Sequence, residues 1–203
     1  MNRYTVTGPE GEHQPGSNDQ VLRNKLGLTR ADDINEAELV LLSQLYDHVL
    51  GITRRDQRLT VAMIKEWHRQ WLGNLYTWAG AERSVNISKD GFPFPPTSQI
   101  SRLLADFDQH CLARLTPCYG MSLQQAVAAI AEVHVELILI HPFREGNGRL
   151  ARLVADAMAF QAGIGPLDYS PWNNRRDSYI AAIQTGLDRN YAPMQALVRQ
   201  AAR

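Results

Sequence analysis

Residues 141–152 read His-Pro-Phe-Arg-Glu-Gly-Asn-Gly-Arg-Leu-Ala-Arg, and they place a polar turn between two apolar segments. The run 133–140 before the turn is apolar, and the run 150–160 after it is compatible with a helix. Gly146 and Gly148 lack a Cβ and can adopt positive φ angles, so the backbone can turn sharply there and expose its N–H groups. This pattern predicts two helices joined by a tight loop whose backbone faces a ligand.

The side chains of this loop suit chemistry on a phosphate. His141 has a reference pKa of about 6.5, so its neutral ring can accept a proton near neutral pH. Glu145 is placed to bind Mg²⁺, which takes one or two carboxylates and leaves its other positions to water and phosphate. Taken alone, a histidine is more often structural, and a Gly-x-Gly turn often only ends one helix and starts the next. A purely structural turn needs no histidine, glutamate and arginine pair together, so we favour the functional interpretation.

The backbone and the arginines of the loop are expected to bind the phosphates. Successive N–H groups around Asn147 can point into one concavity, and a helix that starts there adds the positive end of its dipole. Arg149 and Arg152 lie three positions apart and therefore share a helix face, from which their forked donors can grip phosphate oxygens. The predicted phosphate-binding residues are Arg144, Gly146, Asn147, Gly148, Arg149 and Arg152.

Composition limits the classes of protein to which this chain can belong. Its 203 residues make one large domain or two small ones, with one favoured. Lys plus Arg equals Asp plus Glu at 21 each, so no basic field is available for direct nucleic-acid binding. No apolar run reaches the roughly 18–20 residues of a membrane helix, and the N-terminus lacks the apolar core of a signal peptide. Two cysteines give no disulfide framework, so we expect a cytoplasmic protein without a membrane segment.

Helical periodicity dominates the chain. We expect residues 1–20 to be a flexible arm, because they are rich in Gly and Pro and poor in apolar residues, and residues 21–203 to form a single domain. Apolar positions recur at helical spacing in several segments, such as the one that follows Ser122. The pattern predicts an all-α protein of about seven or eight helices. We interpret His68 and His134, which fall on predicted helices, as structural residues.

Residues 83–94 break the helical pattern. Val85 and Ile87 alternate with polar residues up to an Asp-Gly turn, which is typical of a β-hairpin. Three prolines within 93–96 keep the second arm from being a central strand. The segment is therefore either an ordinary connecting loop or a hairpin flap with an open edge. Unpaired N–H and C=O groups on such an edge can bind an extended peptide in a fixed register.

The chain resembles the Fic family. Residues 141–152 match the family motif His-x-Phe-x-(Asp/Glu)-Gly-Asn-Gly-Arg-x-x-Arg at every fixed position. Residues 76–80, Tyr-Thr-Trp-Ala-Gly, are similar to the aromatic element that precedes the family's flap, and residues 21–27, Val-Leu-Arg-Asn-Lys-Leu-Gly, are similar to an N-terminal signature of many bacterial members. The resemblance covers most of the chain, from about Val21 to about Leu197.

The resemblance implies a Fic-type helical bundle with one β-hairpin flap, and an enzyme that transfers AMP from ATP to a hydroxyl side chain of a target protein. It implies that His141 takes the proton from the target hydroxyl and that Glu145 binds Mg²⁺, which bridges the α- and β-phosphates. Tyr179 aligns with a position near the adenine, although a place in the core is an equal alternative. The flap is expected to bind the target through Ile87, Ser88, Lys89, Asp90, Gly91 and Phe92.

Many family members restrain themselves with a (Ser/Thr)-x-x-x-Glu-(Gly/Asn) helix whose Glu pairs with the second motif arginine, here Arg152. This chain contains no such sequence. It therefore resembles members inhibited by a separate antitoxin protein, and we expect a toxin with such a partner. The alternative is that the restraint is absent or has diverged. Transfer of UMP remains an alternative, as does Doc-type phosphate transfer, which is disfavoured because Doc relatives carry Lys at the position of Gly148. An inactive peptide-binding module is the alternative from another class.

Overall fold

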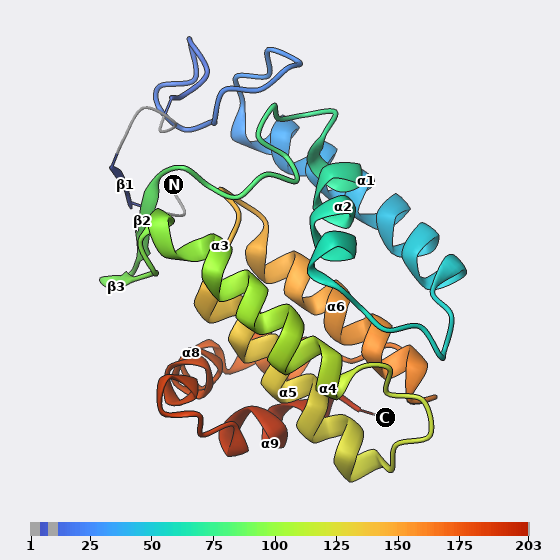
Figure 1. Ribbon diagram of the computed structural model, residues 1–203. Coiled ribbons are helices and arrows are strands. Elements are labelled where there is room, and N and C mark those ends of the chain that lie inside the picture. Colours follow the sequence, from blue (N-terminus) through green and yellow to red (C-terminus); the bar gives the residue numbers. More distant parts are fainter. Residues whose placement is uncertain (1–4, 8–11, 203) are drawn as a thin grey trace.

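Two central helices position the loop that the sequence singles out. The computed structural model describes residues 5–7 and 12–202. Helix α5 (Leu123–Ile140) packs against α6 (Asn147–Gln161), and the loop between them lies at one end of the bundle (Figure 1). A capping box starts α5, because the Ser122 hydroxyl accepts from the Gln125 N–H while the Gln125 side chain accepts from the Ser122 N–H.

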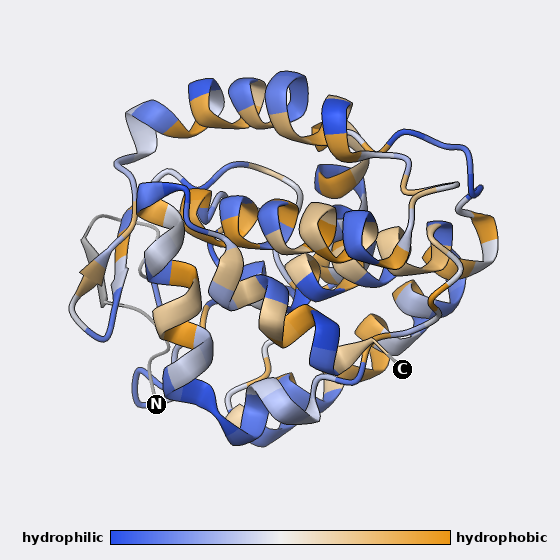
Figure 2. Ribbon diagram, turned by 90° about the horizontal axis from the view of Figure 1, so that it is seen from below, coloured by the Kyte–Doolittle hydropathy of each residue, from blue (hydrophilic) through white to orange (hydrophobic). Residues whose placement is uncertain are grey.

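The other helices cover the central pair on both sides. Helices α1 and α2 pack against α6, whereas α3, α8 and α9 pack against α5. The outer helices carry hydrophilic residues on their outer sides and hydrophobic residues towards the bundle (Figure 2). Their bounds are α1 (Ala31–Ile52), α2 (Val61–Leu72), α3 (Thr97–Asp106), η2 (Phe107–Leu112), α4 (Ala113–Leu115), α7 (Ser170–Asn174), α8 (Arg176–Gln184), η3 (Thr185–Asp188) and α9 (Ala192–Ala201). The predicted helical bundle is confirmed.

The predicted hairpin is part of a larger sheet. Strand β2 (Asn86–Lys89) pairs with β3 (Phe92–Pro93), and the Asp-Gly turn between them has positive φ at both residues, 51° and 80°. Strand β1 (Thr5–Thr7) pairs antiparallel with the other edge of β2, so the order is β1-β2-β3 (Figure 1).

Strand β1 departs from the prediction of an arm with weak structure. Residues 1–4 and 8–11 of that arm lie outside the described residues, but residues 5–7 have a defined place. The physical reason is that a strand edge binds through backbone groups, so the composition of the arm gives no signal for this pairing. The sequence analysis expected a flap with an open edge, and the structure shows that the edge along β2 is covered by β1.

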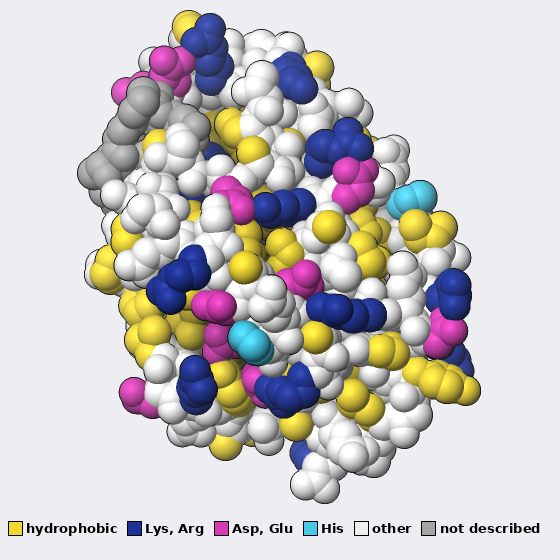
Figure 3. All heavy atoms as spheres, viewed as in Figure 1, with side chains coloured by type: hydrophobic (Ala, Val, Ile, Leu, Met, Phe, Trp, Pro, Cys, Tyr) yellow, Lys and Arg dark blue, Asp and Glu magenta, His cyan; other side chains and the backbone are white. Residues whose placement is uncertain are grey.

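The apolar character of α5 exceeds the sequence expectation. This helix of 18 residues is long and apolar enough by composition to cross a membrane, but 61% of it is buried inside the bundle. A helix packed on several sides needs apolar residues around most of its circumference, which explains the composition. On the face shown in Figure 3, basic and acidic side chains are interspersed without a large region of one sign.

Two glycines provide a test of the packing between η3 and α5. A Cβ on Gly186 would lie 2.2 Å from Cγ1 of Val135, whereas a Cβ on Gly51 in α1 would meet nothing within 4 Å. We expect Gly186→Ala to lower the free energy of unfolding by about 1–3 kcal/mol through overpacking. Gly51→Ala should raise it by up to about 1 kcal/mol, because Ala favours the helix. Denaturant unfolding compares the two variants, and equal midpoints would contradict the contact.

Candidate active site

The loop between α5 and α6 is braced by the side chain of Asn147. Its Oδ1 accepts from the Phe143 N–H at 2.9 Å, and its Nδ2 donates to the Phe143 carbonyl at 2.7 Å. Both residues are buried. The Asn147 side chain is therefore occupied in holding the loop, and Asn147, one of the predicted phosphate-binding residues, does not line the cavity described below. Its backbone lies at the N-terminus of α6, where a helix presents free N–H groups.

A buried histidine on α2 holds the same loop from outside. The Gly80 N–H donates to His68 Nδ1 at 2.8 Å, so the proton lies on Nε2, which donates to the Glu145 carbonyl at 3.0 Å. The ring stacks on Phe143 with centroids 4.0 Å apart. Burial lowers the pKa of His68 to about 4, so the ring is neutral at pH 7. Its role is structural, in agreement with the sequence interpretation.

The fold requires only one of the two motif glycines, Gly146 and Gly148. Gly146 has a φ of 82°, and a Cβ there would lie 2.6 Å from the Trp71 ring, so the fold itself requires glycine. Gly148 lies inside α6 without a positive φ, and a Cβ there would meet nothing within 4 Å. The surrounding protein therefore does not explain Gly148, whereas a ligand that approaches the start of α6 would.

His141 ends α5 in the left-handed conformation, with a φ of 50°. Its Nδ1–H donates to the Ile138 carbonyl at 3.0 Å, which leaves the proton-accepting lone pair on Nε2. The residue is 4% exposed, and its ring stacks on Phe94 with centroids 3.7 Å apart. Burial, with smaller contributions from Arg83 and Lys89, lowers the pKa of His141 to about 3. The ring is therefore neutral at pH 7, and nearby phosphate charge would raise its pKa.

A cavity of about 560 Å³ brings most of the predicted residues together. This volume lies in the range of small-molecule sites. From the motif, its walls include His141, Glu145, Gly146, Gly148, Arg149 and Arg152. From the flap and the C-terminal helices, they include Lys89, Asp90, Phe92, Phe94, Trp172, Asn173, Arg176 and Tyr179. The cavity is thus cationic and polar where α6 begins and aromatic at Trp172 and Tyr179.

The motif arginines line the cavity in different ways. Arg149 Nη1 lies 2.7 Å from Glu38 Oε2, and its guanidinium covers the Trp71 ring at 4.5 Å. Arg149 Nη2 is buried and has no hydrogen-bond partner among the described residues, although it lies 3.6 Å from Glu145 Oε1. Arg152 donates to Asn173 Oδ1 at 3.0 Å. A buried donor without a partner is costly, and an anionic oxygen in the cavity would satisfy it.

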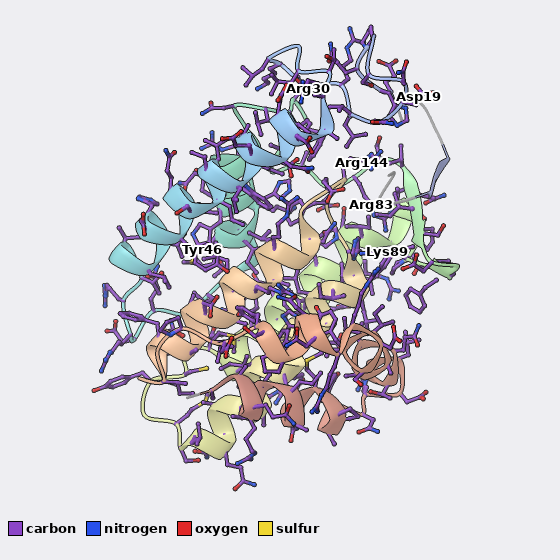
Figure 4. The ribbon with its side chains drawn as sticks, turned by 180° about the vertical axis from the view of Figure 1, so that it is seen from behind. Asp19, Arg30, Tyr46, Arg83, Lys89 and Arg144 are labelled. Atoms are coloured by element: carbon purple, nitrogen blue, oxygen red, sulfur yellow. The ribbon has the colours of Figure 1, made fainter. Side chains whose placement is uncertain are left out.

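Arg144 lies outside this cavity, contrary to the prediction. It is buried and lines a neighbouring cavity of about 510 Å³ with Glu38 and Tyr76. Figure 4 shows it at the end of the bundle near Arg83 and Lys89. Adjacent loop residues point in different directions, so the position of Arg144 in the motif did not reveal which of the two cavities its side chain lines. Glu145 is among the residues that line both cavities.

The flap residues divide into buried and cavity-lining groups. Ile87 is buried with Val85 and Phe94, so its side chain anchors the flap and is not available to a target. At the tip, Asp90 pairs with Arg176 of α8 at 3.3 Å. Among the expected flap residues, those that line the main cavity are Lys89, Asp90 and Phe92, whereas Ser88 and Gly91 do not.

Arg83 connects the flap to the histidine, and the sequence analysis did not detect it. Its buried guanidinium donates to the carbonyl oxygens of His141 at 2.8 Å, Val85 at 2.7 Å and Pro95 at 2.6 Å. All three acceptors are backbone groups, so no side-chain pattern marks them. Arg83 therefore fixes both ends of the flap against the loop.

Tyr179 lines the cavity and is also held by the core, so the structure agrees with its core interpretation and leaves its ring accessible to a ligand. It lines the cavity, and its hydroxyl donates to His134 Nε2 at 2.8 Å. His134 is held by its Nδ1–H, which donates to the Ala151 carbonyl at 3.3 Å. The Tyr179 ring also stacks on Trp172, with centroids 5.3 Å apart. The two rings form an aromatic wall of the cavity. Of these two residues, only Tyr179 was predicted from the sequence.

The donor set fits Mg²⁺ carried by a nucleotide. Glu145 Oε1 accepts from the Gly146 N–H at 2.9 Å, which orients this carboxylate at the junction of the two cavities. The described part of the chain contains no group of three or more His, Cys, Asp and Glu residues that could hold a metal ion. A single carboxylate suits Mg²⁺ shared with phosphates and water, and it does not suit a metal site made by protein alone.

The sequence is similar to proteins of known family. The Fic/DOC family profile matches residues 58–159. The chain is 30% identical over 94% of its length to the protein adenylyltransferase VbhT of Bartonella schoenbuchensis, and 24% identical over 90% to protein adenylyltransferase Fic of Nematostella vectensis. It spans only 39% and 41% of these two proteins. It is 26% identical to y4lH of Sinorhizobium fredii, named a probable protein adenylyltransferase, over 92% of each chain.

Solved structures share the fold. BepC of Bartonella tribocorum with bound AMPPNP superimposes with a TM-score of 0.72 at 21% identity, over 91% of this chain and 93% of that one. The N-terminal Fic domain of a VirB-translocated Bep effector from Bartonella quintana, with bound ADP, gives 0.71 at 25% identity over 90% of each chain. The family profile covers half of the chain and includes the motif, so the resemblance is confirmed. This chain belongs to the Fic/DOC family.

Proposed function

We propose that this chain is a protein adenylyltransferase that moves AMP from ATP to a hydroxyl side chain of a target protein. The observation that carries the proposal is the orientation of His141, whose Nδ1–H is committed to the Ile138 carbonyl while its ring lines a cavity with the motif arginines Arg149 and Arg152. A neutral imidazole held in this tautomer is suited to accept the proton of an attacking alcohol. The names of the adenylyltransferase relatives support the same reaction.

The proposed reaction depends on positioning and charge. The start of α6 and the buried Nη2 of Arg149 bind phosphate oxygens, and Arg152 neutralises charge on the leaving pyrophosphate. Trp172 and Tyr179 provide an aromatic surface for the base. Glu145 would hold Mg²⁺, which when bound supplies positive charge to the phosphates. His141 accepts the proton from the target hydroxyl as its oxygen bonds to the α-phosphorus.

We further propose that restraint comes from a separate antitoxin protein and that the chain acts in the cytoplasm. Within residues 5–7 and 12–202, Arg152 bonds to an amide oxygen of Asn173, and no carboxylate lies within ion-pair distance of it. The described residues thus provide no inhibitory carboxylate at that arginine, which supports an inhibitor supplied in trans. Cys111 and Cys118 are free and buried, which agrees with a reducing compartment.

Labelled ATP tests the reaction. Incubation of the protein with a host lysate, Mg²⁺ and α-³²P-ATP should label a protein band, and γ-³²P-ATP should not. His141→Ala should reduce labelling at least about 10³-fold, because the proton acceptor is lost. Label transferred only from the γ position would instead establish phosphate transfer. The same incubation with α-³²P-UTP separates transfer of UMP from transfer of AMP, and equal labelling by the His141→Ala variant would leave a binding module as the better account.

Gly148 tests whether the phosphates lie at the start of α6. Gly148→Ala should leave the melting temperature unchanged or slightly raised, because the added Cβ meets no protein atom within 4 Å and Ala favours the helix. Affinity for Mg²⁺–ATP should fall about tenfold, a loss of about 1.4 kcal/mol, because the methyl group occupies ligand space. Calorimetric titration measures this affinity. An affinity of Gly148→Ala equal to that of the wild type would show that the phosphates do not bind at the start of α6.

A further inference from the structure

The flap strand β2 is the middle strand of its sheet. Thr5, Val6 and Thr7 are opposite Ser88, Ile87 and Asn86 across one edge, and β3 pairs with the other edge. The remaining free edge of the hairpin belongs to β3, which has two residues, one of which is Pro93 and lacks an N–H. The longer edge of the flap is therefore the edge of β2 that β1 covers (Figure 1).

We propose that this edge of β2 is a strand-exchange surface, which Thr5–Thr7 covers in cis and which an extended segment of the target occupies by displacing β1. The inference rests on the proposed function. Backbone pairing fixes register without requiring a sequence, so either segment can use the edge. β1 opposes three residues of β2, which has four, so a longer target strand can make more pairs. The chain thus competes with its own target for the flap.

A disulfide between β1 and β2 tests the exchange in the full chain. Directly opposed residues of an antiparallel pair have Cα atoms about 4.5–5.5 Å apart, which suits a disulfide. Thr5→Cys with Ser88→Cys should therefore cross-link on oxidation. The native thiols are buried, and burial raises the pKa of Cys118 to about 12 and that of Cys111 as well, so the introduced pair is the more reactive.

Oxidation of this variant should reduce labelling of lysate proteins from α-³²P-ATP at least about tenfold, and reduction should restore it. Binding of Mg²⁺–ATP should stay the same in both states, and Thr5→Cys alone should not respond to oxidation. Failure of the pair to cross-link, or equal labelling by the oxidised and reduced forms, would overturn the exchange. Absence of labelling in both forms would instead reject the proposed function, and the exchange with it.

A second, independent observation concerns Glu38 of α1. Its side chain is buried, the Tyr76 hydroxyl donates to Oε1 at 2.8 Å, and Oε2 lies 2.7 Å from Arg149 Nη1. The Trp71 Nε1–H donates to the Glu38 carbonyl at 2.8 Å, and the Trp71 ring lies under the Arg149 guanidinium. Glu38 and Trp71 thus hold one nitrogen and one face of Arg149.

We infer that Glu38 is a positioning residue for Arg149. A guanidinium is planar, so fixing Nη1 and the stacked face also fixes the direction of Nη2, the buried donor beside the cavity. A side chain held in this way loses less conformational entropy when it binds a phosphate. Glu38 itself touches no substrate in this account.

Glu38→Gln keeps the volume and the acceptor for Tyr76 but removes the charge that holds Arg149. We expect its Kd for Mg²⁺–ATP to rise about tenfold. Glu36→Gln, an exposed change on the same helix, is the matched control and should leave the Kd unchanged. In an Arg149→Ala background, the Glu38→Gln change should have no further effect on the Kd, because the two changes remove one interaction.

Two results would overturn this inference. One is wild-type or tighter ATP binding by Glu38→Gln, which would show that Glu38 competes with phosphate for Arg149. The other is an undiminished effect of Glu38→Gln in the Arg149→Ala background, which a purely structural role would produce. A wild-type protein that binds no Mg²⁺–ATP would reject the nucleotide site itself, and therefore both the proposed function and this role.

Discussion

The hydrogen bond from His68 Nε2 to the Glu145 carbonyl oxygen ties the loop after α5 to α2. A loop that carries a sharp turn, a left-handed histidine and a buried carboxylate has few regular backbone bonds of its own, so its shape depends on side chains from elsewhere. Asn147 spans the backbone of Phe143, and Trp71 closes the space beside Gly146. These contacts place the metal-binding candidate Glu145, the start of α6 and the candidate proton acceptor His141.

Burial is the second constraint on the site. His141 and His68 are both neutral because burial penalises their charged forms, but they are oriented for different tasks. His68 uses both nitrogens for the backbone, whereas His141 donates from Nδ1 to a carbonyl and its ring lines the cavity. The same physical effect thus gives a structural support in one case and a candidate base in the other. Hydrogen-bond partners, and not the degree of burial, distinguish the two.

Much of this architecture could be predicted from sequence, because it follows from local patterns. Helical periodicity located the central helices, and the Asp-Gly turn located the hairpin. The motif fixed the residue types around His141 but not the directions of their side chains, so it did not reveal that the Asn147 side chain braces the loop or that Arg144 lines the neighbouring cavity. Glu38 lies 111 positions from Arg149, and no local pattern connects them. The partners of Arg83 and β1 are backbone groups, which have no sequence signature.

The three carbonyl bonds of Arg83 have a mechanical consequence. The Arg83 guanidinium donates to the carbonyls of Val85 and Pro95 at the base of the hairpin and to the carbonyl of His141. Because one planar group makes all three bonds, we expect the base of the hairpin and His141 to move together. A hinge at the root of the flap would have to break charge-assisted bonds inside the protein, which is costly. Bending is therefore confined to the tip beyond the strands. If a target segment pairs with the hairpin as proposed, its distance from the His141 ring is then fixed by the flap and does not depend on the sequence of the segment.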